Sequence, residues 1–274
     1  MEKLSSASLN PAAIPQPGRI PLLAAVYALG LALFLAIEPT KSWLLLLVTV
    51  FVALGTDGIV RTHPRSVFRD AIDTAPHLVV PAVAALAFGF FLEDTVEGYW
   101  SLLAALVAGV VMAGVIYAEY LSAGSRGELQ AVGRFGLNVV TYLSAFALYA
   151  VFYGFEVDLL PAAVCVGLVS AVLGAEILHA PETMQVGVAQ VSLRALGFAV
   201  ATGLIVAEAR WALYFTPLDG FLAAVFLLLV FYVVTGLMQH YLMGHLSRSV
   251  IVEFAMVASL GVIMVILGHS FSAA

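Results

Sequence analysis

Acidic and imidazole side chains recur near the carboxyl ends of apolar segments in this sequence. Asp57, Glu119 and Glu176 each close such a segment, and His240 stands at the equivalent place in a later one. A carboxylate there faces the negative end of the helix dipole, so it needs a compensating partner. Pairing with arginine at the membrane interface would supply one. A functional polar cluster on one face of the membrane is the alternative.

Metal-assisted hydrolysis is the sharpest chemistry that these side chains could perform. Glu176 and His179 are one helical turn apart, and His240, His245 and Glu253 could complete a ligand set. Carboxylate and imidazole both bind zinc, and a bound ion would activate water against a lipid-like substrate. However, the sequence contains no His-Glu-x-x-His, and five positions turn His240 and His245 about 140° apart on a helix. The sequence therefore names no cofactor and establishes no metal site.

The candidate cluster on the cytoplasmic face draws acids and histidines from several segments. Its members are Asp57, Glu119, Glu176, His179, His240, His245 and Glu253. If a metal is bound, Glu176, His179 and His240 are its candidate ligands. His63 and His77 lie in or beside a polar loop and are expected to be solvated.

A second polar feature is a stripe inside one apolar segment. Its candidate cavity-lining residues are Asn138, Thr141, Tyr142, Tyr149 and Tyr153. Asn138, Tyr142, Tyr149 and Tyr153 share one helical face, which should turn toward neighbouring helices because polar groups are costly in lipid. Hydrogen bonds between helices are one interpretation, and a cavity for a lipid-like or aromatic ligand is the other.

The composition decides what kind of element carries these residues. Of 274 residues, 63% are hydrophobic and 10% charged, and the mean hydropathy is +1.08. A soluble domain is about half apolar, so this chain exceeds what a water-exposed fold can bury. Its apolar runs do not alternate in polarity as barrel strands do, which predicts an all-α, polytopic membrane bundle.

About nine transmembrane helices follow from the apolar runs. The expected spans are 20–37, 42–60, 77–92, 99–122, 135–154, 159–178, 190–209, 219–242 and 249–269. Residues 1–19 are polar and proline-rich, which predicts a flexible cytoplasmic tail ahead of a single transmembrane domain at 20–274. Cys165 lies inside an apolar run and is expected to be a buried small side chain.

Charge and tryptophan placement predict the orientation. With the amino terminus in the cytoplasm and the carboxyl terminus outside, nine Lys and Arg residues fall inside and two outside, which is a strong positive-inside bias. Trp43, Trp100 and Trp211 all fall at expected outer helix ends, where indole rings prefer the headgroup layer. The protein is therefore expected to be a multi-pass protein of the cell membrane.

The chain also hints at internal duplication and at helix packing faces. Asp57, Glu119, Glu176 and His240 are separated by 62, 57 and 64 residues, which would fit four tandem helical hairpins plus a ninth helix. Any regular array of spans gives a similar period, so duplication stays open.

Small residues recur every four positions at Ala163, Gly167, Ala171 and Ala175, and again at Ala105, Gly109 and Ala113. Such stripes favour close helix contacts.

No motif specifies an activity, and three classes of function remain. The absence of a catalytic signature favours a non-catalytic scaffold, assembly or accessory subunit over an enzyme. A carrier for a neutral or amphiphilic molecule is one alternative, and a metal-dependent enzyme acting on a lipid-like substrate at the cytoplasmic face is the other. The expected partners are the lipid bilayer and either another membrane protein or a second copy of the chain. Nucleic acid is not an expected partner.

Overall fold

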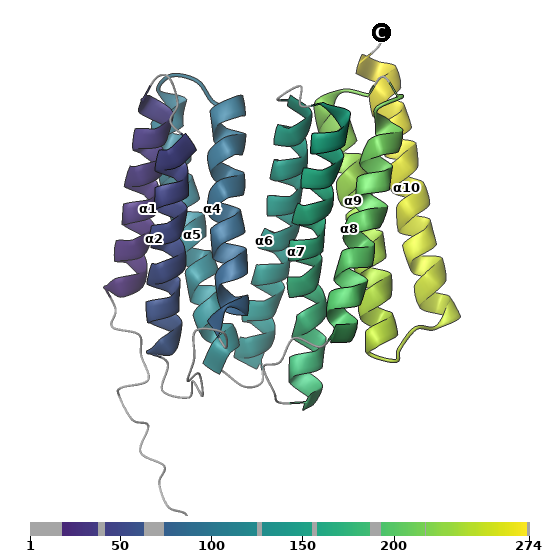
Figure 1. Cartoon of the computed structure of the whole chain (residues 1–274), viewed down its shortest axis with the longest axis horizontal. Helices are drawn as coiled ribbons and strands as arrows, with labels where there is room; N and C mark the ends of the chain where they lie inside the picture. Colours follow the sequence, from purple (N-terminus) through teal and green to yellow (C-terminus); the bar gives the residue numbers. More distant parts are fainter. Residues whose placement is uncertain are drawn as a thin grey trace, which may run out of the picture.

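The computed structural model describes residues 18–37, 42–62, 74–124, 128–154, 158–186, 193–216 and 218–272, with only the backbone at 124, 179–186 and 271–272. These residues form a bundle of long, roughly parallel and antiparallel helices (Figure 1). In chain order the helices are α1 (Arg19–Ala36), α2 (Ser42–Arg61), α4 (Pro76–Thr95), α5 (Trp100–Gly124), α6 (Glu128–Gly154), α7 (Leu159–Val186), α8 (Leu193–Leu213), α9 (Gly220–Leu242) and α10 (Arg248–Ser272).

The prediction of an all-helical chain with about nine helices that could cross a membrane is confirmed for the described residues. Within the described residues, 9 helices are long and apolar enough to cross a membrane. The main differences are at helix ends, since α6 starts at Glu128 and α7 continues to Val186. Hydropathy locates the part of a helix that suits hydrocarbon, whereas backbone hydrogen bonding continues into polar sequence. Residues 1–17 lie outside the described part of the chain, so the flexible tail stays a prediction.

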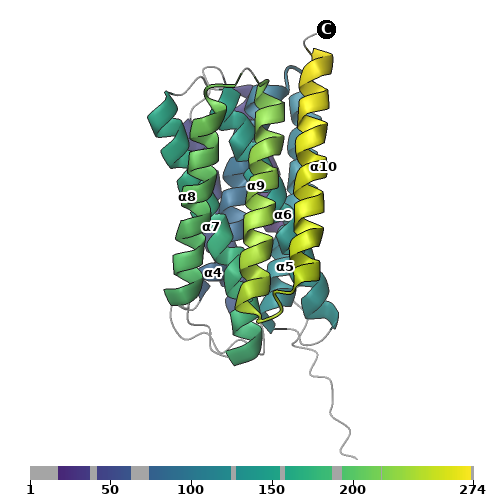
Figure 2. The same ribbon diagram turned by 90° about the vertical axis from the view of Figure 1, so that its right-hand side faces the viewer.

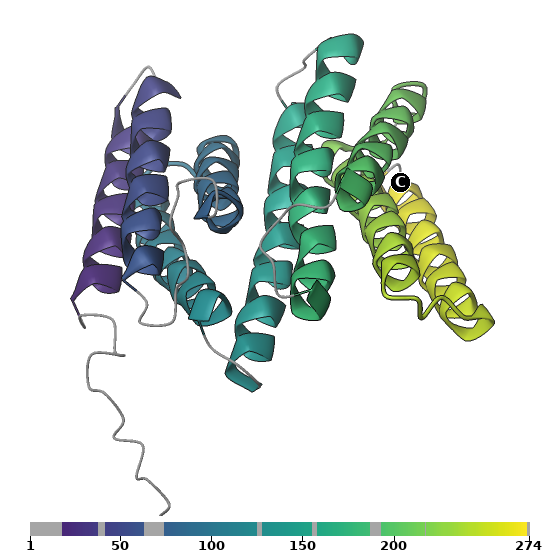
Figure 3. The same ribbon diagram turned by 60° about the horizontal axis from the view of Figure 1, so that its bottom comes forward.

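The helices form two groups in the bundle, and their apolar cores are connected through α6 (Figures 1 and 3). The first half consists of α1, α2, α4 and α5, whose core includes Tyr27, Phe34 and Met112. The second half consists of α6 to α10, and its main core includes Tyr149 and Phe231. The halves meet where α4 contacts α6 and α7, and where α5 contacts α6. A small apolar cluster joins α4 to α6 at this contact.

The last helix, α10, is peripheral. It packs against α9 among the described helices, and Figure 2 shows it along one side of the bundle. In its most apolar stretch of 18 residues, 6% of the residues are buried, compared with 28% or more in the corresponding stretch of each other described helix. Most of its apolar surface therefore faces the surroundings of the bundle.

Small residues bring particular helices into close contact, as their spacing predicts. A Cβ atom at Gly167 would lie 3.0 Å from the Cβ atom of Ala207 and 3.1 Å from the carbonyl oxygen of Gly203. One at Gly109 would lie 2.6 Å from the Cβ atom of Ala28 on α1. In lipid, such close backbone approach supplies packing energy that the hydrophobic effect does not.

The antiparallel order of the helices sorts charge and tryptophan to opposite ends. The basic end contains Arg19, Arg61, Arg134, Arg194 and Arg248 and lies at the bottom of Figure 1. The tryptophan end contains Trp43, Trp100 and Trp211, at the start of α2, the start of α5 and the end of α8. Lys3, Lys41, Arg65, Arg69 and Arg126 lie outside the described residues. The tandem hairpin repeat stays a prediction, because an antiparallel bundle has this order without duplication.

We predict that Gly203→Ala destabilises the protein and that Gly197→Ala does not. A Cβ atom at Gly203 would lie 2.5 Å from the carbonyl oxygen of Gly167 and 3.2 Å from the amide nitrogen of Ala171. Backbone atoms cannot move aside easily, so the expected loss is roughly 1–3 kcal/mol. Gly197 is on the same helix, and an added Cβ atom there meets nothing within 4 Å.

Unfolding of both variants by a graded denaturing detergent, read by circular dichroism, measures the difference. Equal stability of the two variants would show that α7 and α8 do not approach each other this closely.

Candidate functional site

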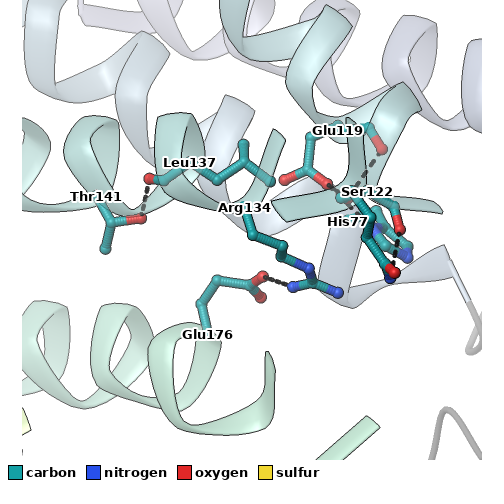
Figure 4. Close-up of polar contacts among 8 residues, drawn as sticks. His77, Glu119, Ser122, Arg134, Leu137, Thr141 and Glu176 are labelled. Carbon is teal, nitrogen blue, oxygen red and sulfur yellow. Dashed lines mark hydrogen bonds and ion pairs between the residues drawn. The ribbon is translucent and has the colours of Figure 1, made fainter. Parts of the chain in front are cut away.

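A buried carboxylate and imidazole form the centre of the candidate site. The Glu119 side chain is 0% exposed, and its Oε2 atom lies 2.9 Å from Nδ1 of His77 (Figure 4). The Ser122 hydroxyl donates at 2.9 Å to the Glu119 carbonyl oxygen and at 3.4 Å to Oε2. The Oε1 atom of Glu119 is buried with no hydrogen-bond partner among the described residues. A buried oxygen without a partner is costly and marks a position that needs a functional or structural reason.

A guanidinium and a second carboxylate lie beside this pair. Arg134 Nη1 is 3.8 Å from Glu176 Oε1, and the two side chains are 15% and 9% exposed. In Figure 4, Arg134 extends between Glu119 on one side and Glu176 on the other. Electrostatic interactions also link Glu176 with Glu119 and His77. These four side chains therefore act on one another and are named the junction cluster: His77, Glu119, Arg134 and Glu176.

Four helices from both halves position the junction cluster. His77 is the second residue of α4, where Pro76 starts the helix without needing a backbone donor. Glu119 is in the last turns of α5, and Arg134 and Glu176 are on α6 and α7. Gly133 lets α6 approach α5, because a Cβ atom there would lie 3.0 Å from the carbonyl oxygen of Ala118. This contact brings Arg134 next to Glu119.

The formal charges of the junction cluster do not cancel without an extra proton. Two carboxylates and one guanidinium give a net charge of −1, and one proton shared by His77 and Glu119 brings the sum to zero. An uncompensated charge is expensive in a low-dielectric interior. The junction cluster therefore combines two buried carboxylates with one guanidinium at the contact between the two halves.

The chain matches a protein family described as "Protein of unknown function (DUF5656)" over residues 21–268. The chain belongs to this family. Neither a curated protein nor a solved structure matches it. The match covers the helical bundle up to the last turn of α10, so the junction cluster lies within the DUF5656 region.

Asp57, another acid predicted for this end of the DUF5656 chain, forms an ion pair separate from the junction cluster. Asp57 Oδ2 lies 2.8 Å from Nε of Arg61, one turn further along α2. The Thr74 hydroxyl donates to Asp57 Oδ1 at 2.6 Å, and Arg61 Nη2 donates to Thr74 Oγ1 at 3.3 Å. The Asp57 and Arg61 side chains are partly exposed and balance each other in charge, whereas Thr74 is buried. They join the end of α2 to the residues before α4.

Three further members of the predicted cluster form no described ion pair with Glu119 or Glu176: His240, His245 and Glu253. The His240 ring packs on Phe254 with centroids 5.9 Å apart, and its Nδ1 atom is buried without a described partner. His245 and Glu253 are exposed. The side chain of His179 lies outside the described residues. Among the residues that are described, no three His, Cys, Asp or Glu side chains gather in a way that could hold a metal ion.

The polar stripe on α6 is engaged in hydrogen bonds to other helices. Its hydroxyl bonds join Tyr142 to Thr235 at 3.2 Å, Tyr149 to Ser170 at 2.6 Å and Tyr153 to the carbonyl oxygen of Leu213 at 3.2 Å. Thr141 donates to its own helix, to the carbonyl oxygen of Leu137 at 2.9 Å, and Asn138 is half-buried. These contacts fix α6 against α7, α8 and α9. A cavity along the stripe stays a prediction.

Sequence reasoning missed two members of the junction cluster. The expectation that His77 is solvated was wrong, because its side chain is 12% exposed and contacts Glu119. Arg134 is not among the candidate site residues, because the sequence does not distinguish it from the other arginines at the same end of the chain. A usable signal was present, since His77 follows a helix-starting proline and precedes a long apolar run. Its ring must then enter the bundle or face lipid.

We predict that Arg134→Met destabilises the protein far more than Arg61→Met. Removing Arg134 leaves the charge of Glu176 buried beside that of Glu119, and breaking a buried pair typically costs about 3–5 kcal/mol. Arg61 is at the same end, but its side chain is 39% exposed, and pairs of that kind contribute roughly 0–1 kcal/mol. Detergent unfolding of both variants at neutral pH gives the comparison. Similar losses would mean that water reaches the junction cluster freely.

Proposed function

We propose that this protein is a proton-coupled membrane carrier and that the junction cluster binds the coupled proton. The burial of Glu119 supports this proposal most directly. Its carboxylate is fully buried, with one oxygen beside His77 and the other without a described partner. Ionisable groups inside membrane proteins are rare and are usually part of ion or proton pathways. Candidate substrates are neutral or amphiphilic small molecules, which need no counter-charge in the protein.

The position of the junction cluster supports coupling between proton binding and helix movement. His77 and Glu119 belong to the first half, whereas Arg134 and Glu176 belong to the second. Loss of the shared proton leaves a net negative charge at the contact, which favours an arrangement that admits water. A proton can shift the balance between two arrangements only by binding one more tightly than the other. Charge neutralisation supplies that difference in affinity here.

The arginines of the basic end indicate how the protein is oriented in the membrane. We infer that the basic end faces the cytoplasm, because lysine and arginine concentrate on that side of membrane proteins. The tryptophan end would then lie at the outer interface of the cell membrane. In this orientation the junction cluster lies nearer the cytoplasmic end of the bundle, and the proton would be released to that side.

A non-catalytic accessory subunit is the second candidate, and α10 favours it. This helix packs against α9 among the described helices and leaves nearly all of its apolar surface outside the bundle. A helix of another membrane protein could cover that surface. The third class is a metal-dependent enzyme at the cytoplasmic face. The described side chains include no group of three His, Cys, Asp or Glu residues that could hold a metal ion for it.

We predict that the two halves change their separation with pH and that Glu119→Gln abolishes this change. Spin labels would be attached to Tyr99→Cys, in the turn between α4 and α5, and to Tyr214→Cys, after α8, in a Cys165→Ala background. Both tyrosines are exposed, at 99% and 59%. Pulsed dipolar spectroscopy should give different distance distributions at about pH 5 and about pH 8, where imidazole changes charge. Glutamine carries no negative charge and cannot share a proton with His77, so Glu119→Gln should give one distribution at both values.

Glu128→Gln is the matched control, because Glu128 is an exposed acid at the same end of the bundle. It should behave like the parent protein.

Transport itself would be read from a pH-sensitive dye inside proteoliposomes, while neutral and amphiphilic solutes are added one at a time. A carried solute should change the internal pH, and Glu119→Gln should remove that signal. If the distances between the spin labels are the same at both pH values and another membrane complex co-purifies stably, the carrier function is rejected in favour of the accessory subunit.

A further inference from the structure

A groove along α7 and α8 is separate from the junction cluster. Its volume is about 520 Å³, within the range of pockets that hold small organic molecules, roughly 300–1,000 Å³. Small residues of both helices form its floor, including Gly167, Ala171 and Gly203, and exposed Leu168 and Leu204 stand along its sides. Such a surface fits a single hydrocarbon chain.

One carboxylate lines this apolar groove. Glu208 is exposed on α8 and lies three residues before Trp211, which also lines the groove at the tryptophan end. One helical turn, about 4.5 Å, therefore separates it from an indole ring of the kind that marks the headgroup layer. No described residue forms an ion pair with Glu208. A carboxylate below the headgroup layer favours a cationic neighbour, because hydrocarbon does not solvate its charge.

A second copy of this chain does not supply that cation. A two-fold contact through the groove would bring the Glu208 side chains of both copies together, and like charges at an interface are costly. Among the described Lys and Arg residues, the one at the tryptophan end is Arg210. It is 5% exposed and lies over the Tyr153 ring, with its Cζ atom 4.2 Å from the ring centroid. The occupant must bring its own positive charge.

We propose that the groove binds an aminolipid of the phosphatidylethanolamine type. One acyl chain lies over the small residues of α7 and α8, and the primary ammonium of the headgroup donates hydrogen bonds to Glu208. An ammonium carries three donors, whereas the methylated choline headgroup has no N–H to donate. An anionic headgroup would be repelled. The groove therefore prefers ethanolamine over choline lipids, independently of any carrier activity.

Trp211 provides a reporter inside the groove. The chain has 3 tryptophans, so Trp43→Phe with Trp100→Phe leaves Trp211 as the fluorophore. The protein is placed in phosphatidylcholine nanodiscs that contain a small fraction of either phosphatidylethanolamine or phosphatidylcholine with brominated acyl chains, which quench indole fluorescence. The relative affinity from quenching should favour ethanolamine roughly threefold, the effect of one partly exposed ion pair.

Variants of Glu208 test the assignment of the headgroup contact. Glu208→Gln should reduce the preference to about equal affinity, and Glu208→Lys should shift it toward brominated phosphatidylglycerol. Glu97→Gln is the control, since Glu97 is an exposed acid of the α4–α5 turn outside the groove, and it should keep the threefold preference. Equal quenching by both lipids in the parent protein, or an unchanged preference in Glu208→Gln, would overturn the proposal. Carbodiimide cross-linking of Glu208 to a lysine of another protein would assign the groove to a protein partner instead.

Discussion

Lipid cannot hydrate an ionised side chain, and this constraint organises the molecule. Most of the described chain is helix with an apolar surface, so each buried charge must find its compensation inside the bundle. Glu119 shows this requirement clearly, because it is fully buried and has one oxygen without a described partner. At the contact between the two halves, His77 and Arg134 are the groups that can compensate it, whereas Glu176 adds a second negative charge. The same constraint acts on Glu208, which faces outward and would be compensated by a lipid in the proposed groove.

The amino-acid sequence predicts the architecture well because hydrocarbon imposes a strong and regular pattern. Spans of about 20 apolar residues, arginines at one end and tryptophans at the other are all visible without structure. Helix ends are less predictable, as at Glu128 and Val186, because helices continue into polar sequence. The small-residue stripe at Ala163, Gly167 and Ala171 predicts a contact face, but it does not name α8 as the partner helix. Partner choice depends on the three-dimensional order of the bundle.

The candidate site was only partly predictable. The helix-dipole argument selects Glu119 and Glu176 as acids that need partners, and it selects Asp57 equally, although Asp57 forms a partly exposed pair with Arg61. Position in a sequence cannot separate these cases, because burial depends on which helices cover each end. His77 and Arg134 were harder to assign, since a histidine beside a loop and an arginine at an interface usually meet water. Their roles follow from the meeting of α4, α5, α6 and α7.

We infer that the junction cluster binds one exchangeable proton through Glu119. Proton binding by the purified protein between about pH 5 and about pH 8, the range in which imidazole titrates, tests this inference in the parent and in Glu119→Gln. The parent should bind about one more proton per chain than Glu119→Gln, and Glu128→Gln should bind as many protons as the parent. Identical titration of the parent and Glu119→Gln would show that Glu119 does not hold the proton.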